Sequence, residues 1–494
     1  MKSQKSFLNA VKWAYTANWG ERAFSALFTF ILAALLGPRD FGVVAIAMVY
    51  IQFLKMFLDQ GFMAALIQKK DLDQKHLDAV FWMDLVLSLF LVGASFLLGG
   101  WWARANHTPE VAKLVFVLSL CIPIEGLAAV QSANLNREMD FRALSIRSNI
   151  AVIVSGVVGI GMAFAGFRVW ALVGQQLVRD SVALALLWNL GSWRPRFEFS
   201  WKHLKDLAGF SISNFTAQLA LFAEGQSGSI LLGVLFGPVA VGLYRLADRL
   251  VYSVVAMATT SIQSVSLPEF SRHQDNPPEL RKSALTCIRL SSTMTLPALS
   301  GMAAVAGALM AALGPKWVPA TDGLRVLCFM GMATVLACFT GPLLQALSKP
   351  HHLAGLEWAR AILGTVLLVI VGLLVRNSTI NWQIMAIALV RTVPMVVLVL
   401  PVFLYILMKL CDLSFRDLTS AVMPSVLASL GAAVAVAPFT LSGWLSGARP
   451  WVLLAAEVIV GAVVGLSILL IFDNQLYGFL SSISQRIRRS LATS

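Results

Sequence analysis

Long apolar runs recur along the 494-residue chain and are separated by short polar segments. A bilayer core about 30 Å thick is crossed by roughly 20 helical residues. The pattern therefore predicts an all-α polytopic membrane protein with about fourteen transmembrane helices. Their approximate limits are 16–36, 41–66, 79–102, 110–134, 144–166, 169–190, 206–236, 241–267, 284–312, 320–346, 354–375, 382–409, 418–439 and 450–472.

Four short motifs occur in the same order in both halves of the chain, which indicates an internal repeat. The matches are Leu36-Gly37-Pro38 with Phe236-Gly237-Pro238, Leu177-Val178-Arg179 with Leu389-Val390-Arg391, Gln131 with Gln345, and Asn18-Trp19 with Asn214-Phe215. Six helices per copy is an even number, so the copies are parallel repeats. We expect a six-helix N-terminal lobe at 1–200, a six-helix C-terminal lobe at 201–412, and two extra transmembrane helices with a basic cytoplasmic tail at 413–494.

Composition supports a membrane protein. Hydrophobic residues make up 58% of the chain and charged residues only 13%, against about a quarter charged in soluble domains. The net charge of +13 reflects Lys and Arg in alternate loops, among them Arg137, Arg142 and Arg147, as the positive-inside rule predicts. We therefore expect both termini in the cytoplasm, and we expect no nucleic-acid partner.

Motifs for catalysis or for a cofactor are missing from the sequence. There is no GxxxxGK[ST] phosphate loop, HExxH or GxSxG, and the polar loops are too short for an enzyme active site. The five cysteines include no CxxC pair, and the six histidines lie in or beside loops. We expect no enzymatic activity, no cofactor and no metal site.

Polar side chains inside the apolar runs mark the candidate site, because each ionisable group costs about 2.5–3.5 kcal/mol to insert at the centre of a span. They concentrate on the first two helices of each repeat, which predicts that these helices flank a central hydrated cavity. Candidate substrate-binding residues are Arg22, Arg245, Arg249, Asn18, Lys55, Asn214 and Gln218. Candidate coupling or gating residues are Glu21, Asp59, Glu224 and Asp248.

A simpler interpretation of some of these residues stays open. Lys55 with Asp59, and Asp248 with its flanking arginines Arg245 and Arg249, fit intrahelical ion pairs that only neutralise one another. Arg179 and Arg391 are second-rank candidates, since they fit membrane anchors equally well. Arginine in the cavity favours a phosphate-bearing substrate, because its planar guanidinium binds phosphate oxygens in pairs.

Two sequence stretches resemble a known family. Leu35-Leu36-Gly37-Pro38-Arg39-Asp40-Phe41-Gly42, continuing through Asp59-Gln60-Gly61-Phe62, is similar to the first helices of polysaccharide flippases of the colanic-acid exporter type. Phe236-Gly237-Pro238 and Leu267-Pro268-Glu269-Phe270-Ser271-Arg272 resemble the second half of proteins of the same family, which belongs to the multidrug/oligosaccharidyl-lipid/polysaccharide exporter superfamily.

The Gly-Pro pairs also allow neighbouring helices to approach closely, and we assign them no catalytic role.

The resemblance implies a two-lobed transporter of the bacterial inner membrane. Its partner would be an oligosaccharide linked to undecaprenyl diphosphate, carried across by alternating access for exopolysaccharide biosynthesis. Other polysaccharide-assembly proteins are further candidate partners. In relatives, basic residues of the first and eighth helices face the cavity, and Arg22, Arg245 and Arg249 match them here. The alternatives are a drug or small-cation efflux transporter of the same superfamily and, from another class, a membrane glycosyltransferase or polymerase.

Overall fold

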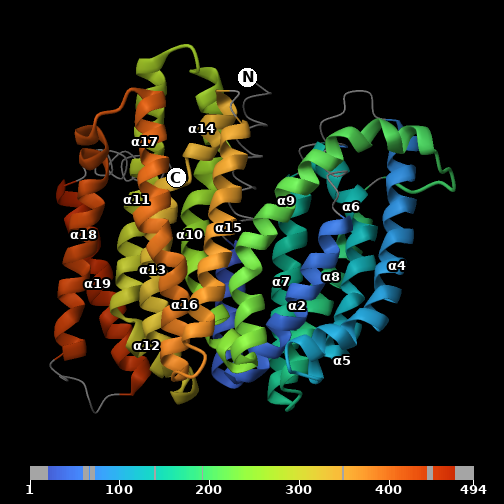
Figure 1. The fold of residues 1–494 in the computed structure, drawn as a ribbon, viewed down its shortest axis with the longest axis horizontal. Coiled ribbons are helices and arrows are strands. Elements are labelled where there is room, and N and C mark those ends of the chain that lie inside the picture. The colour runs from blue at the N-terminus through green and yellow to red at the C-terminus, as the bar shows by residue number, and fades with distance from the viewer. Residues whose placement is uncertain are drawn as a thin grey trace, which may run out of the picture. The chain divides into compact units, whose positions relative to one another are not determined.

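The computed structural model describes residues 20–58, 66, 73–137, 141–191, 193–347, 350–441 and 449–472. Within these ranges the chain is almost entirely helical and contains no β-strand (Figure 1). Among the described residues, ten helices are long and apolar enough to cross a membrane, or eleven if α11 and α12, bent by 64° at their junction, form one span. The all-α, multi-pass fold predicted from the apolar runs is thereby confirmed.

The predicted number of spans is larger than the number that the structure supports by length and apolarity. The additional predicted spans fall on residues 20–35, on α8 and on α9, all of which are helical but are not among the ten or eleven. For the predicted span 16–36 the structure describes only residues 20–36, and within α9 the segment Gly225–Phe236 is an apolar helix shorter than a full span. Helix α8 carries Gln175, Gln176, Arg179 and Asp180, which lower its mean hydropathy. A total of fourteen therefore stays a prediction.

Two compact units make up the fold: unit 1 is residues 1–246 and 356–387, and unit 2 is 247–355 and 388–494. Described helices of unit 1 are residues 20–35, α2 (Pro38–Leu58), α4 (Gln74–Ala105), α5 (Glu110–Ser119), α6 (Cys121–Arg137), α7 (Phe141–Phe164), α8 (Val169–Leu190) and α9 (Trp201–Phe236). Unit 2 contains α11 (Pro277–Ala304), α12 (Ala306–Leu313), η1 (Pro315–Ala320), α13 (Thr321–Ala337), α14 (Thr340–Ala346), η2 (Met395–Val399), α17 (Leu400–Cys411), α18 (Phe415–Leu441) and α19 (Pro450–Phe472). Three helices contribute to both units: α10 (Pro238–Arg272), α15 (Pro350–Leu374) and α16 (Ile380–Pro394).

Unit 1 is a bundle in which helices that are adjacent in sequence pack in pairs. Helix α7 packs on α8, and α4 packs on both α5 and α6 (Figure 1). One buried cluster joins α4 and α6 to the first turn of α9 through Phe81, Val130 and Leu204, and Trp193 from the preceding segment completes it. The segment 193–200 is therefore part of the bundle and not a loose linker.

The two Gly-Pro motifs lie against each other inside unit 1. A Cβ added to Gly42 would lie 1.6 Å from the carbonyl oxygen of Pro238, and a Cβ added to Gly242 would lie 1.8 Å from the carbonyl oxygen of Pro38. The start of α2 and the start of α10 thus meet backbone to backbone, and each glycine removes the side chain that would block the other helix. The predicted close approach at these motifs is confirmed. Each glycine faces the proline of the other motif, which fits the predicted internal repeat.

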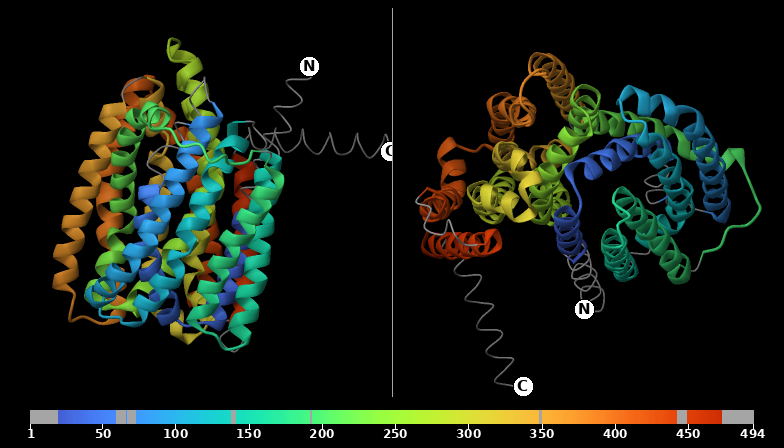
Figure 2. Two further views of the ribbon diagram at one scale, coloured as in Figure 1. Left: turned by 90° about the vertical axis from the view of Figure 1, so that its right-hand side faces the viewer. Right: turned by 90° about the horizontal axis from the view of Figure 1, so that it is seen from below.

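Unit 2 is built around α11, which packs on α13 and α18. The last two helices, α18 and α19, lie side by side in the right-hand view of Figure 2 and pack along their length. Gly431, Gly461 and Gly465 leave room for neighbouring aliphatic side chains between them. Buried apolar residues of α10, α11, α14 and α17, among them Phe270 and Leu343, form a separate core.

The predicted lobe boundary after residue 200 falls directly before α9. Compact unit 1, however, also includes α9, the start of α10 and residues 356–387. The division into lobes 1–200 and 201–412 describes the repeat and stays a prediction, whereas the compact units describe which helices pack together.

Replacing either contact glycine by alanine should destabilise the protein. Gly42→Ala and Gly242→Ala each force a methyl group into a neighbouring carbonyl group, and overpacking of this kind costs about 1–3 kcal/mol or more. Thermal unfolding of the purified protein in detergent should show a midpoint lowered by several degrees. Gly93→Ala, within α4 where nothing lies within 4 Å of the added Cβ, is the matched control. Equal midpoints for all three variants would contradict the close contact.

Candidate functional site: a charged cavity in unit 1

A cavity of about 570 Å³ lies among the helices of unit 1. Side chains from residues 20–35, α2, α4, α6, α7 and α8 line it. Seven of the lining residues are ionisable: Glu21, Lys55, Asp84, Glu125, Arg147, Arg179 and Asp180. Three of these are basic and four acidic, so the cavity combines both signs. It differs in this respect from the predicted substrate site, whose ionisable candidates Arg22, Arg245, Arg249 and Lys55 are all cationic.

Lys55, in the last turn of α2, forms a three-membered charge cluster. Its Nζ lies 2.5 Å from Oε2 of Glu125 on α6 and 3.5 Å from Oδ2 of Asp180 on α8. The Lys55 side chain is only 18% exposed, so an uncompensated ammonium group there would be costly. The two carboxylates supply the compensation and tie three helices together. The intrahelical partner considered from the sequence, Asp59, lies outside the described residues.

Two arginines complete the wall of the cavity. Arg179 of α8 forms an ion pair with Glu21, with Nη2 and Oε1 2.5 Å apart. Arg147 of α7 donates a hydrogen bond from Nη1 to Oγ of Ser132 at 3.0 Å, while its Nε is buried without a hydrogen-bond partner in the described structure. Arg147 was counted with a cytoplasmic loop in the topology prediction, but it lies inside α7 and faces the cavity.

The repeat counterpart of Arg179 makes a similar pair in unit 2. Arg391 of α16 lies with Nη1 3.7 Å from Oδ1 of Asp248 on α10. In both halves the arginine of the Leu-Val-Arg motif therefore contacts an acidic residue from the first or second helix of its own repeat. These two arginines were second-rank candidates, and their partners, Glu21 and Asp248, were predicted to have coupling or gating roles.

The remaining predicted residues are distributed as follows. Arg22 and Arg245 are half-buried in unit 1, and Arg249 is exposed in unit 2; none of the three is among the residues that line the cavity of unit 1. Asn18 and Asp59 lie outside the described residues. Asn214, Gln218 and Glu224 belong to the helical backbone of α9, and their side chains are outside the described part of the chain. Substrate binding by these residues stays a prediction.

Sequence reasoning missed four ionisable residues that line the cavity: Asp84, Glu125, Arg147 and Asp180. All four lie within apolar helices beyond the first two of the repeat. The rule that an ionisable residue inside a span is a functional candidate applies to them equally. Asp180 directly follows the Leu177-Val178-Arg179 motif but has no acidic counterpart in the second copy, where Thr392 follows Arg391.

The fold and this site define a polytopic helical membrane protein with a charged interior cavity. The chain belongs to the polysaccharide biosynthesis protein family, which matches residues 31–322. It is 26% identical over 337 residues to the succinoglycan biosynthesis transport protein ExoT of Rhizobium meliloti (strain 1021), a match that covers 68% of each chain. It is 27% identical over 306 residues to the teichuronic acid biosynthesis protein TuaB of Bacillus subtilis (strain 168), covering 60% of this chain and 62% of that protein.

The fold is also that of a solved flippase. The inward closed conformation of the lipid II flippase MurJ superimposes with a TM-score of 0.71 at 14% sequence identity, covering 93% of this chain and 98% of that chain. At this identity the similarity concerns the fold alone. The named relatives and this structural neighbour are transport, biosynthesis and flippase proteins, and none is named as an enzyme.

Removing the positive charge of Lys55 should destabilise unit 1. Lys55→Met leaves Glu125 and Asp180 close together without their shared cation, and breaking a buried ion pair from one side costs up to about 3–5 kcal/mol. The partial exposure of Glu125 reduces this cost. We expect a clearly lowered thermal midpoint in detergent, and we expect Lys55→Met combined with Asp180→Asn to recover part of it.

The control for this prediction is Arg39→Ala. Arg39 forms an ion pair with Glu110 in which both side chains are more than half exposed, and such pairs contribute about 0–1 kcal/mol. A Lys55→Met variant as stable as Arg39→Ala would contradict the assignment of Lys55 as a buried charge shared by three helices.

Proposed function

We propose that this protein translocates an oligosaccharide linked to undecaprenyl diphosphate from the cytoplasmic to the outer leaflet of the bacterial inner membrane, for exopolysaccharide assembly. Family membership and the polysaccharide roles of the named relatives support the substrate class. They do not favour the drug-efflux alternative. The observation that carries the transport mechanism is the charged cavity inside a bundle of apolar helices.

A charged, hydrated head group cannot cross hydrocarbon unaided. The protein would provide a polar path for the head group, while the polyprenyl tail stays in lipid. Arg22, Arg245 and Arg249 remain our candidates for the diphosphate, because guanidinium groups bind phosphate oxygens in pairs and stay protonated in a partly dry site. Both termini would lie in the cytoplasm, as the distribution of Lys and Arg favours.

The ion pairs Arg179–Glu21 and Arg391–Asp248 are the proposed gating elements. Each joins the sixth helix of a repeat to its first or second helix, so each can lock one arrangement of those helices and release another. An ion pair that breaks during a conformational change biases the equilibrium only by the difference in its stability between the two states. Alternating access through such pairs would be coupled to substrate binding or to an ion.

Deletion of the gene tests the proposed function. We expect surface polysaccharide to disappear and the lipid-linked precursor to accumulate on the cytoplasmic side. Unchanged surface polysaccharide with no accumulation would overturn the proposal. Increased drug sensitivity with normal polysaccharide would instead support the efflux alternative.

Complementation of the deletion strain tests the gating pairs. Arg179→Gln should lower export at least tenfold with membrane insertion unchanged, because Glu21 loses its partner, and Arg179→Lys should restore part of the activity by keeping the charge. Arg391→Gln should show the same pattern. Arg39→Ala, which removes an exposed pair, should export normally. Normal export by both glutamine variants would remove the gating assignment.

A further inference from the structure

The segment that joins the two repeats is attached to the first turns of α4 by side-chain hydrogen bonds. Asp78 accepts a hydrogen bond through Oδ1 from the backbone N–H of Arg196 at 3.0 Å, and Trp82 donates one from Nε1 to the carbonyl oxygen of Arg196 at 2.7 Å. Gln74 donates one to the carbonyl oxygen of Arg194 at 3.0 Å. These contacts place the first turn of α9 beside the first turn of α4.

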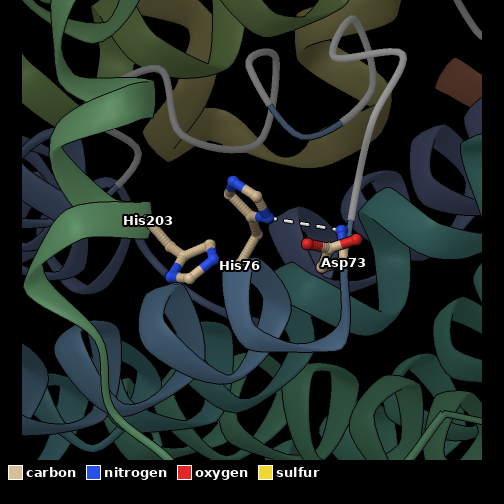
Figure 3. A group of neighbouring side chains, drawn as sticks. All are labelled: Asp73, His76 and His203. Atoms are coloured by element: carbon tan, nitrogen blue, oxygen red, sulfur yellow. Dashed lines mark hydrogen bonds between the residues drawn. The ribbon is translucent and has the colours of Figure 1, made fainter.

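Two histidines and an aspartate meet at this junction (Figure 3). The rings of His76 and His203 are perpendicular, with their centroids 4.5 Å apart. One ligand atom each from Asp73, His76 and His203 lies within 4.8 Å of the other two. Figure 3 shows Nδ1 of His76 directed toward Asp73 and a ring nitrogen of His203 facing His76. Residues distant in sequence thus form a compact group of nitrogen and oxygen donors.

The hydrogen bonds of the two imidazoles suit metal coordination. Nδ1 of His203 lies 2.6 Å from Oγ of Ser200. When Nδ1 donates its proton to that oxygen, Nε2 carries a lone pair, and this arrangement is typical of histidine ligands to metals. Nδ1 of His76 accepts a hydrogen bond from the backbone N–H of Asp73 at 3.3 Å. That contact is long for a hydrogen bond, so exchanging it for a metal–nitrogen bond costs little.

The distances also allow a metal after small side-chain movements. Tetrahedral Zn²⁺ with ligand bonds of about 2.0–2.1 Å needs ligand atoms about 3.3 Å apart. The separations here, up to 4.8 Å, exceed that value by an amount that rotation of a side chain removes. Asp73 is exposed, so its side chain can move toward the imidazoles, while buried His76 is the fixed member of the group.

We propose that Asp73, His76 and His203 form a binding site for a borderline divalent transition metal of the Zn²⁺ type. Two neutral imidazoles and one carboxylate are ligands that Zn²⁺ prefers, and a fourth position is left for water. The ion would join α4 to α9 at the point where the second repeat begins. It would hold the first helix of that repeat against the first repeat, and it would reinforce the hydrogen bonds to the segment 193–200.

Zn²⁺ binding to purified protein tests this site. The protein, prepared without a polyhistidine tag and stripped of metal, should bind one Zn²⁺ per chain at this site in a calorimetric titration. Its thermal midpoint should rise with Zn²⁺. Co²⁺ should give the visible absorption bands of a low-coordinate nitrogen and oxygen site. Absence of high-affinity binding by the wild-type protein would overturn the proposal.

Variants locate the ion. Asp73→Asn keeps a residue that can begin α4, and His203→Gln changes a half-buried side chain in α9; each should weaken Zn²⁺ binding at least tenfold and abolish the rise in thermal midpoint. His107→Asn alters an exposed histidine with a left-handed backbone (φ 50°), which asparagine tolerates, and should bind Zn²⁺ as the wild type does. Undiminished binding by His203→Gln, or loss of binding in His107→Asn alone, would contradict the site.

Discussion

The insertion of ionisable groups into apolar helices is the constraint on which the account of this protein depends. A charge at the centre of a span is tolerated only when a counter-charge or water compensates it. In unit 1 this compensation takes the form of a cavity whose walls bring Lys55 between Glu125 and Asp180, and Arg179 against Glu21. The helices that supply these groups are therefore fixed by their charges as well as by their apolar contacts.

The same constraint links structure to function. Seven ionisable side chains line the cavity of unit 1, and at least two ion-paired groups among them hold its helices together. A protein that passes a charged head group across the bilayer needs a polar interior and helices that can exchange partners. In the function proposed here, paired charges would provide both, because each pair would form in one arrangement of the helices and give way to substrate or water in another. The close backbone contact between Gly42 and Gly242 joins the starts of α2 and α10 without side-chain bulk.

Much of the fold could be predicted from the sequence because apolar runs of membrane length are a strong signal. The repeat motifs also correctly indicated close helix packing at Pro38 and Pro238. The charge partners were harder to predict. Spacing along one helix suggested Asp59 as the partner of Lys55, whereas the described partners come from α6 and α8, distant in sequence. Likewise, His76 and His203 were interpreted as loop residues, because nothing in the local sequence shows that the segment 193–200 brings α9 back onto α4.

Translocation by the purified protein can be measured in lipid vesicles. In vesicles that carry lipid-linked oligosaccharide in the inner leaflet, the fraction cleaved by a membrane-impermeant glycosidase added outside reports movement across the bilayer. We expect wild-type protein to raise this fraction and protein carrying Arg179→Gln to leave it at the level of protein-free vesicles. Equal cleavage with wild-type protein and with protein-free vesicles would contradict the proposed function, and full activity of the variant would contradict the role assigned to the charged cavity.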